Sequence, residues 1–167
     1  MKKLLYTSLC VSFFLLLLSP AFGQAEAAAS AEAAASDEIE RLLDEPAITY
    51  RQAAWFTLAL TQDKFPTGDE VRVSEHAFVT AWDNGWFDKS AERETPITMA
   101  GLSYLIMNVF DIKGGLMYRL FKNPRYAYRE LKSLGYISGN AYANQKVSGE
   151  QFLQILGNAV DGGSGEI

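Results

Sequence analysis

A faint internal repeat constrains the fold of this chain more than any other feature of its sequence. Residues 77–111 align without a gap with residues 127–161 at an offset of 50, although only five of the 35 aligned pairs are identical. The aligned positions share residue classes at helix starts, at helix ends and at apolar positions, and Gly85 aligns with Gly135. A period near 50 residues indicates a repeated supersecondary unit. We therefore expect a scaffold or binding module.

Three helix starts share one signal. Thr49, Thr98 and Ser148 each follow a β-branched residue and precede an apolar-periodic run, which is the position of a helix N-cap. Gln52 and Gln151 add the capping-box spacing to Thr49 and Ser148, whereas Thr98 has a glycine at that spacing. The sequence thus predicts three N-capped helices.

Two more helices are expected, each ended by a glycine. Ser74 is placed to cap a helix that stops at Gly85. Asn123, followed by proline, is placed to cap a helix that stops at Gly135. The nearest approach to an alternating strand pattern is 70–73, which is too short to build a sheet.

These signals predict an all-α fold of tandem helix-turn-helix repeats of about 50 residues, packed as a small helical bundle. The helical domain is expected over 37–161. It would contain a partial repeat at 37–62, a repeat at 74–111 and a repeat at 124–161. Residues 162–167 are expected to form a flexible C-terminal tail.

The first 23 residues have the pattern of a secretory signal peptide. Lys2 and Lys3 precede an apolar run over 4–18, and small residues at 21 and 23 suit signal peptidase, so we expect cleavage after Gly23. The apolar run is shorter than the ~20 residues of a spanning helix. We therefore expect a periplasmic or secreted protein with no stable membrane span after cleavage. The Ala/Glu/Ser-rich stretch 24–36 is expected to be a tether.

Cleavage changes what the chain can bind. It removes Cys10, the only cysteine, which excludes disulfides and thiolate metal sites. The remaining 144 residues suit one ordinary domain and carry 13 basic against 20 acidic residues, a net charge of −7. So acidic a chain is a poor candidate for nucleic acid, and we expect no cofactor and no metal.

Residues 128–160, YRELKSLGYISGNAYANQKVSGEQFLQILGNAV, resemble the S-layer homology family. The shared pattern is a helix, a Gly-Ile-Ile-x-Gly-like turn, a loop and a Thr-Arg-Ala-Glu-like helix start. Residues 77–111 look like a more diverged copy, and 48–60 like the second helix of a truncated first copy. The resemblance implies an all-helical module, often three repeats in a pseudo-threefold bundle, that attaches proteins to peptidoglycan or wall polysaccharide.

The chain departs from that family at its ligand-binding positions. Polymer contacts in the family come largely from the Arg of the Thr-Arg-Ala-Glu start. The matching positions here hold no Arg; they are Tyr50, Met99 and Gly149. Those that match the Glu are Gln52, Gly101 and Gln151. Without a guanidinium these sites lose a bidentate donor for charged sugar substituents, so a shared fold does not by itself imply shared binding.

The segment 113–132 between the two clearer copies is the candidate binding surface, because it places basic and aromatic residues on an acidic protein. Such surfaces bind anionic polymers, sugars, acidic proteins or lipid headgroups. In the alternative interpretation, Leu116, Leu120 and Phe121 pack at helical spacing and the charges are simply solvated. The candidate residues are Lys113, Tyr118, Arg119, Lys122, Arg125, Tyr126, Arg129 and Lys132.

Trp82, Trp86 and Phe87 cluster at the turn of the 74–111 repeat, where Tyr136 and Ile137 hold the equivalent place in the next copy. Their expected role is packing between helices. The alternative is a platform on which a carbohydrate ring stacks.

Signals for catalysis are weak. His76 is the only histidine, which excludes a multi-histidine metal site, and no Gly-x-Ser-x-Gly elbow occurs. Glu92 with Glu94, or Asp83 with Asp88, could in principle pair as glycosidase carboxylates, but acidic residues in loops usually serve solvation.

The sequence therefore predicts a protein that is not an enzyme. We expect a secreted or periplasmic interaction or scaffold module of the bacterial cell envelope, whose partners are other envelope proteins. The alternative is a domain that binds and anchors to a cell-wall polymer, either peptidoglycan or polysaccharide.

Overall fold

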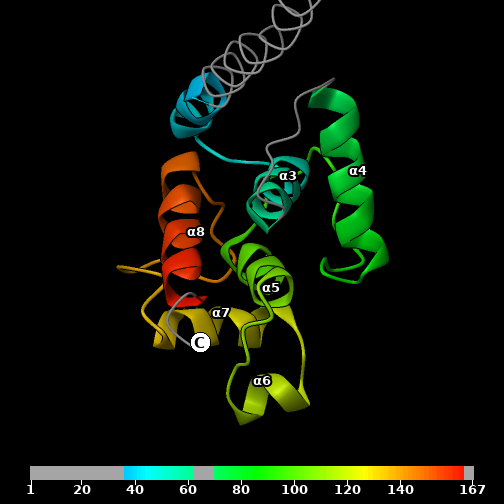
Figure 1. The fold of residues 1–167 in the computed structure, drawn as a ribbon. Coiled ribbons are helices and arrows are strands. Elements are labelled where there is room, and N and C mark those ends of the chain that lie inside the picture. The colour runs from blue at the N-terminus through cyan, green and yellow to red at the C-terminus, as the bar shows by residue number, and fades with distance from the viewer. Residues whose placement is uncertain (1–35, 62–69, 164–167) are drawn as a thin grey trace, which may run out of the picture. The chain divides into compact units, whose positions relative to one another are not determined.

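The computed structural model describes residues 36–61 and 70–163 (Figure 1). Within these ranges the chain forms seven helices and no strand, which confirms the predicted all-α class. The proposed signal peptide and most of the proposed tether lie outside the described residues. The chain divides into a unit of residues 1–38 and a unit of residues 39–167, and the packing discussed below belongs to the second unit.

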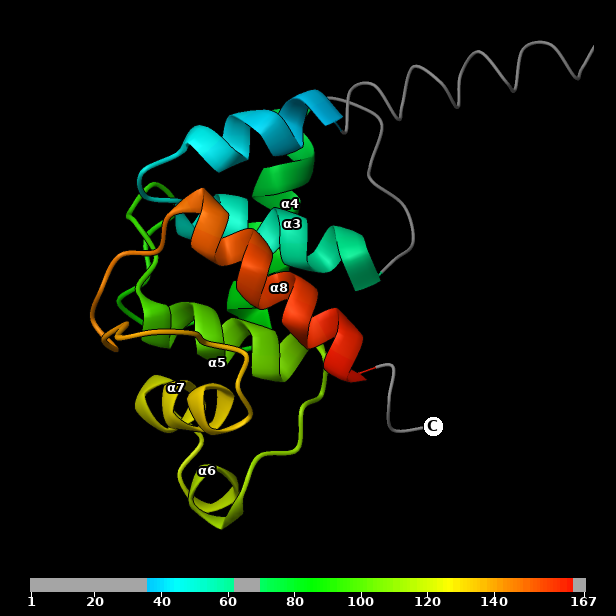
Figure 2. The ribbon, with the colours of Figure 1, turned by 90° about the vertical axis from the view of Figure 1, so that its left-hand side faces the viewer.

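A short helix over residues 36–44 comes first, and six further helices follow it. Helix α5 packs against α7 and α3, α3 packs against α4, and α6 rests on α7. Figures 1 and 2 agree that α6 lies beyond α7, on the side of the unit away from α3. The six are α3 (Tyr50–Thr61), α4 (Glu70–Asp83), α5 (Met99–Val109), α6 (Leu116–Leu120), α7 (Pro124–Ser133) and α8 (Gly149–Gly163).

Three buried residues at the centre of this unit close a ring of backbone hydrogen bonds. The N–H of Ile48 donates to the carbonyl of Val147 (2.9 Å), Val147 donates to Ile97 (3.2 Å), and Ile97 donates back to Ile48 (2.9 Å). All three are fully buried. Buried backbone groups must find hydrogen-bond partners, and here each of the three finds them in another segment. The ring thus joins three segments that are far apart in the sequence.

Each member of the ring directly precedes a capped helix. Thr49 and Gln52 exchange two bonds, from the Thr49 N–H to Gln52 Oε1 (2.8 Å) and from the Gln52 N–H to Thr49 Oγ1 (3.2 Å). Ser148 and Gln151 form the same pair at 3.4 and 3.3 Å. Thr98 Oγ1 accepts from the N–H of residue 101 at 3.1 Å. These bonds satisfy N–H groups that a helix start leaves free.

Glycines end α4 and α7 as the sequence predicts. Gly85 and Gly135 have positive φ angles of 69° and 81°. The following N–H in each case donates back across the helix end, from Trp86 to the Ala81 carbonyl and from residue 136 to residue 131, both at 2.9 Å. A left-handed residue is required there, and glycine adopts it without steric cost.

Two expected boundaries are wrong. Ser74 does not cap a helix, because α4 already begins at Glu70 and the stretch 70–73 is helical. The Ser74 side chain is buried inside α4 and accepts a hydrogen bond from Arg51 Nη1 at 2.9 Å. At the other end, α8 continues to Gly163, so residues 162 and 163 are helical; 164–167 lie outside the described residues.

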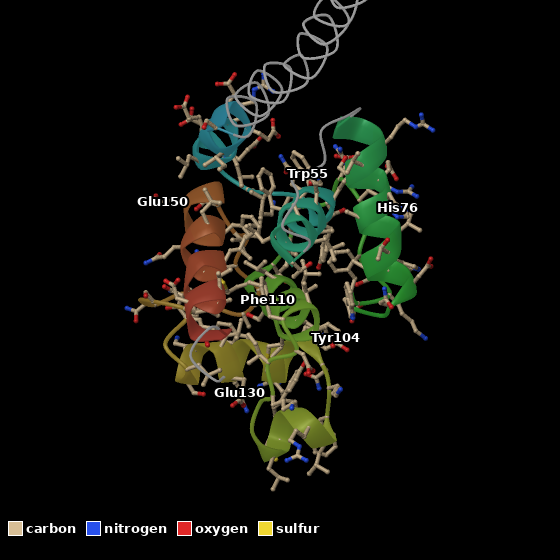
Figure 3. All side chains as sticks on the ribbon, viewed as in Figure 1. Trp55, His76, Tyr104, Phe110, Glu130 and Glu150 are labelled. Carbon is tan, nitrogen blue, oxygen red and sulfur yellow. The ribbon has the colours of Figure 1, made fainter. Side chains whose placement is uncertain are left out.

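Aromatic contacts connect the helices. Tyr50 meets Phe87 edge-on, with ring centroids 5.1 Å apart, and Phe56 of α3 meets Phe152 of α8 at 6.2 Å. The packing role expected for the turn aromatics holds for Phe87, which is buried, and in part for Trp86. It does not hold for Trp82, which is 40 % exposed. The sticks in Figure 3 fill the space between the ribbons of this unit.

Candidate functional site

The eight candidate residues of the segment 113–132 divide between two places. Lys113, Tyr118, Arg119 and Lys122 line one pocket, together with residues from the end of α5. The other four lie on α7. All six cations are exposed, whereas the Tyr118 side chain is buried and only 4 % of it is accessible.

On α7 the aromatic rings already have partners within the protein. Tyr126 stacks on Phe121, with ring centroids 5.9 Å apart. The guanidinium of Arg129 lies 5.8 Å from the centroid of the Tyr126 ring. The hydroxyl of Tyr128 donates to the carbonyl of residue 141 at 2.6 Å, and Lys132 Nζ lies 5.6 Å from its ring centroid. These contacts leave little free ring surface for sugar stacking on α7.

Helix α6 exposes large apolar side chains. Leu116 is 70 % exposed, Met117 52 %, Leu120 64 % and Phe121 53 %. We call these four residues the α6 apolar surface. The alternative interpretation is therefore wrong about the packing of Leu116 and Leu120. Phe121 is half exposed but stacks on Tyr126, and the cations are exposed as that interpretation expected. Contiguous exposed apolar groups bordered by charges typically mark an interaction site.

The pocket beside α6 has a volume of about 540 Å³. We call it the α5–α6 pocket. Three cations of the candidate set line it, and none of them forms an ion pair with a described residue. The lining residues are Met107, Asn108, Asp111, Ile112, Lys113, Gly114, Tyr118, Arg119 and Lys122.

The glycine pair at 114–115 permits close packing around this pocket. A Cβ atom on Gly114 would stand 2.8 Å from the ring of Tyr118 and 2.9 Å from both Glu130 Cγ and Met107 Cε. Such distances are too short for real contacts. Gly114 is therefore the point where the loop passes α5, α6 and α7 at close range.

A second, shallower pocket of about 650 Å³ lies between α4 and the loop 91–95. Phe78 and the exposed Trp82 form one wall, with ring centroids 6.1 Å apart. Glu92 and Glu94 contribute carboxylates to the other wall. This pocket brings together Trp82, one of the residues considered for a carbohydrate platform, and the Glu92–Glu94 pair considered for a glycosidase. The other platform residues, Trp86 and Phe87, do not line it.

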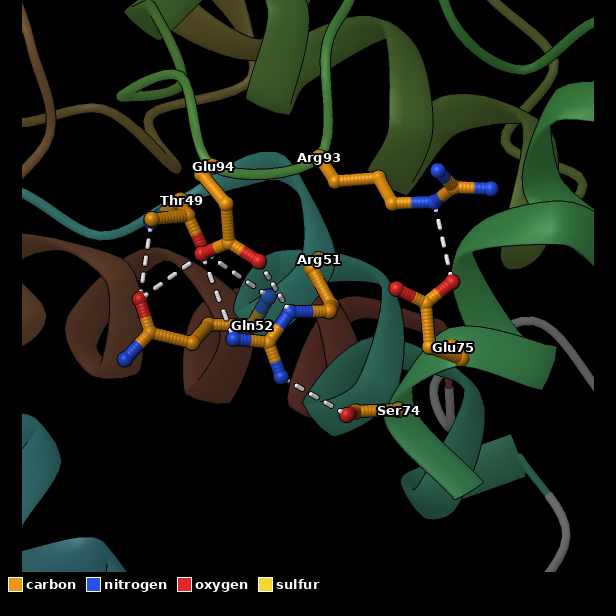
Figure 4. A network of polar contacts seen from close by, with 7 residues as sticks. All are labelled: Thr49, Arg51, Gln52, Ser74, Glu75, Arg93 and Glu94. Atoms are coloured by element: carbon orange, nitrogen blue, oxygen red, sulfur yellow. Dashed lines mark hydrogen bonds and ion pairs between the residues drawn. The ribbon is translucent and has the colours of Figure 1, made fainter. Parts of the chain in front are cut away.

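Ion pairs hold two of the carboxylates at or near this pocket. Arg51 binds both oxygens of Glu94, at 2.8 and 3.2 Å, and Arg93 pairs with Glu75 at 2.9 Å (Figure 4). The N–H and hydroxyl of the serine at 90 donate to Asp88 and hold the pKa of that carboxyl below its usual value. A general acid needs a raised pKa, so Asp88 is poorly suited to that role. Both oxygens of Glu94 already bind Arg51.

The three positions that correspond to the Arg of the resembled family have no free side chain. Tyr50 and Met99 are buried. A Cβ atom on Gly149 would overlap the carbonyl group of Leu42, so no larger residue fits at that position. These positions serve packing between helices.

Sequence reasoning missed Met117, Asn108 and Asp111 as parts of the site. The feature that distinguishes Asp111, a positive φ of 48°, is visible only in the structure. Met117 belongs to a stretch of apolar residues confined between Gly115 and Asn123. A helix that short offers too few turns to bury every large side chain, and this signal was available in the sequence.

Comparisons with protein-family models, with curated proteins and with solved structures found no match. Over 36–61 and 70–163, no helix has the length and apolar character needed to cross a membrane. In the same ranges no group of three His, Cys, Asp or Glu side chains is placed to hold a metal ion. The site must therefore be interpreted from its own geometry.

Proposed function

We propose that the chain is built from three copies of one two-helix unit, related by a pseudo-threefold axis through the ring of Ile48, Ile97 and Val147. The closed ring supports this arrangement, as do the capped helices that follow each member. A second set of bonds repeats in the same order. The first helical N–H groups of Tyr50, residue 99 and residue 149 donate to the carbonyls of residues 95, 145 and 45, at 3.1, 2.8 and 2.9 Å.

On this scaffold we propose a non-catalytic interaction module of the bacterial cell envelope, exported by the N-terminal signal and reaching its partner on the 24–36 tether. The observation that carries the proposal is the α6 apolar surface, in which four large side chains are each more than half exposed. Its neighbours in the sequence include four exposed cations, Lys113, Arg119, Lys122 and Arg125. The partner we infer is an envelope protein with an apolar patch rimmed by acidic groups, because charge complementarity steers association.

The energetics suit an interface of this kind. Fully burying one leucine or phenylalanine side chain contributes about 1.5–3 kcal/mol, and interfaces concentrate their affinity in a few such residues. Helix α6 packs on α7, and the four side chains of the α6 apolar surface are exposed. A partner can therefore reach this surface without rearrangement of the core.

A photo-crosslinking residue at Met117 tests this proposal in the native envelope. It should give one specific protein adduct, which Leu116→Ser with Phe121→Ser should abolish while the melting temperature changes little. The matched control places the crosslinker at Tyr142, which is 70 % exposed but distant in sequence from α6. Equal adducts from both positions, or none from Met117, would contradict the proposal.

The second candidate is binding to a cell-wall polymer, and Trp82 is the observation that favours it. Its exposed ring and the neighbouring Glu92 offer stacking and hydrogen bonding to a sugar. Co-sedimentation with isolated sacculi is the measurement. Loss of sedimentation in Trp82→Ala, or in Arg125→Glu with Arg129→Glu, would support polymer binding; failure of the unaltered protein to sediment would exclude it.

A further inference from the structure

The α5–α6 pocket concentrates positive charge that no described residue pairs, on an acidic protein. Lys113, Arg119 and Lys122 line it, and Asp111 supplies the one carboxylate among its described lining residues, so two positive charges are in excess. Glu130, whose carboxylate lies near Gly115, does not line the pocket. Unpaired cations around a concave site favour an anionic ligand.

A buried hydroxyl at the same pocket points to a ligand independently of the charges. Tyr118 is 96 % buried, and its hydroxyl forms no hydrogen bond of ordinary geometry with a described residue. Burial, followed by the nearby Tyr104, raises the pKa of Tyr118 to about 12, and the Asn108 side chain opposes this only in part. The phenol therefore stays protonated and can donate a hydrogen bond, and the side chain of Asn108 is the polar group beside it.

The residues around this hydroxyl are held in place. The side-chain amide of Asn108 donates to the carbonyl of Tyr104 at 2.6 Å, which leaves its oxygen as an acceptor. The ring of Tyr118 packs closely on the backbone of Gly114, which limits its movement. A preorganised pocket loses less entropy on binding than one formed from loose side chains.

We propose that the α5–α6 pocket binds the phosphate group of a phosphorylated polyol or sugar. A phosphate offers enough oxygens to accept from Arg119, both lysines and the Tyr118 hydroxyl together, whereas a carboxylate offers two. The volume of about 540 Å³ exceeds the needs of a bare anion, and the oxygens of Asn108 and Asp111 can accept from hydroxyl groups. This site goes beyond the docking role of the α6 apolar surface and does not depend on it.

Calorimetric titration of the exported chain with sn-glycerol 3-phosphate tests the proposal directly. We expect saturable binding at one site, and no heat of binding with glycerol. Arg119→Gln should weaken binding about 10- to 100-fold, the effect of losing a charge-assisted hydrogen bond. Arg129→Gln is the matched control, because it removes the same charge from α7 outside the pocket, and it should leave the affinity within about twofold.

Tyr118→Phe separates a ligand contact from a structural role. Removing the unpaired hydroxyl should keep or slightly raise the melting temperature, yet weaken binding about tenfold by removing one donor. If Tyr118→Phe binds as tightly as the parent protein, or if Arg119→Gln and Arg129→Gln weaken binding equally, the assigned pocket is wrong.

Vesicles distinguish the two sources of this phosphate chemistry. If the natural ligand is a lipid headgroup, phosphatidylglycerol vesicles bind the chain, phosphatidylcholine vesicles do not, and Tyr118→Phe reduces the binding. If it is a soluble phosphate, only the titration gives a signal. Vesicle binding that requires Leu116 and Phe121 but is insensitive to Tyr118→Phe, without a signal in the titration, would overturn the proposal. So would the absence of binding in both assays.

Discussion

Replacing Gly149 by alanine should be strongly destabilising, although alanine is the better helix former. Gly149 begins α8, and a Cβ atom there would overlap the carbonyl group of Leu42. The backbone around Leu42 must therefore move away. That movement exposes the Leu42 side chain, now 2 % accessible, and breaks the bond from the Gly149 N–H to the Glu45 carbonyl at 2.9 Å.

The magnitude follows from these contacts. Burial of a leucine side chain contributes about 1.5–3 kcal/mol and the hydrogen bond about 0.5–1.5 kcal/mol. The higher helix propensity of alanine offsets at most about 1 kcal/mol of this loss of stability. We expect Gly149→Ala to lower the free energy of unfolding by about 2–3 kcal/mol, which for a unit of this size corresponds to about 8–12 °C in Tm.

Gly157→Ala is the matched control within the same helix. Nothing lies within 4 Å of a Cβ atom at Gly157, and the residue is exposed. This substitution should raise the free energy of unfolding by about 0.5–1 kcal/mol through helix propensity alone. Urea denaturation followed by circular dichroism measures both variants. If Gly149→Ala proves as stable as the parent or more so, the close approach to Leu42 does not constrain the fold.

Three further predictions concern stability. Thr98→Ala should cost about 1 kcal/mol in urea denaturation because the N–H of Gly101 loses its cap, and Thr98→Ser should restore most of it. Gly114→Ala should lower Tm, with a cost of about 1–3 kcal/mol from overpacking against Tyr118 and Met107, and an unchanged Tm would contradict the packing described. Because the pKa of Tyr118 is about 12 in the folded protein against an ordinary 10.0, the folded state resists ionisation of this phenol, and below pH 10 the fold carries no ionisation penalty. Stability is lost as pH rises from 10 to 12, so the stability of Tyr118→Phe should fall less than that of the parent across this window.

The local signals of the sequence identified several helix ends. Thr49 and Thr98 lie three residues from their hydrogen-bonding partners, so the interaction is encoded within one turn. Gly85 and Gly135 could be predicted equally well, since a left-handed backbone conformation at a helix end involves one residue and favours glycine there. Ser74 has the same cap signal, but the prediction of a cap there is wrong, because α4 begins four residues earlier. Its hydroxyl accepts a hydrogen bond from Arg51, which lies 23 positions away in the sequence.

The candidate site was predictable in part. The basic and aromatic character of 113–132 is a matter of composition, and that stretch does contain the α6 apolar surface and five of the nine residues that line the α5–α6 pocket. Its division into two places was not predictable. Tyr118 turns inward against Gly114, whereas Leu116 and Leu120 turn to solvent, because the packing of α6 on α7 decides which side of a short helix is covered.

By itself the sequence determined the helical class, the three capped helix starts and the glycine stops, because each depends on interactions within a few residues. Ile48, Ile97 and Val147 stood out there only as β-branched residues before a cap. The tertiary structure alone decided that their backbones hydrogen-bond to one another in a closed ring, that Gly149 must be small, and that leucines on α6 face solvent. These features depend on which distant segments meet, and burial and close packing are properties of that meeting rather than of any local stretch.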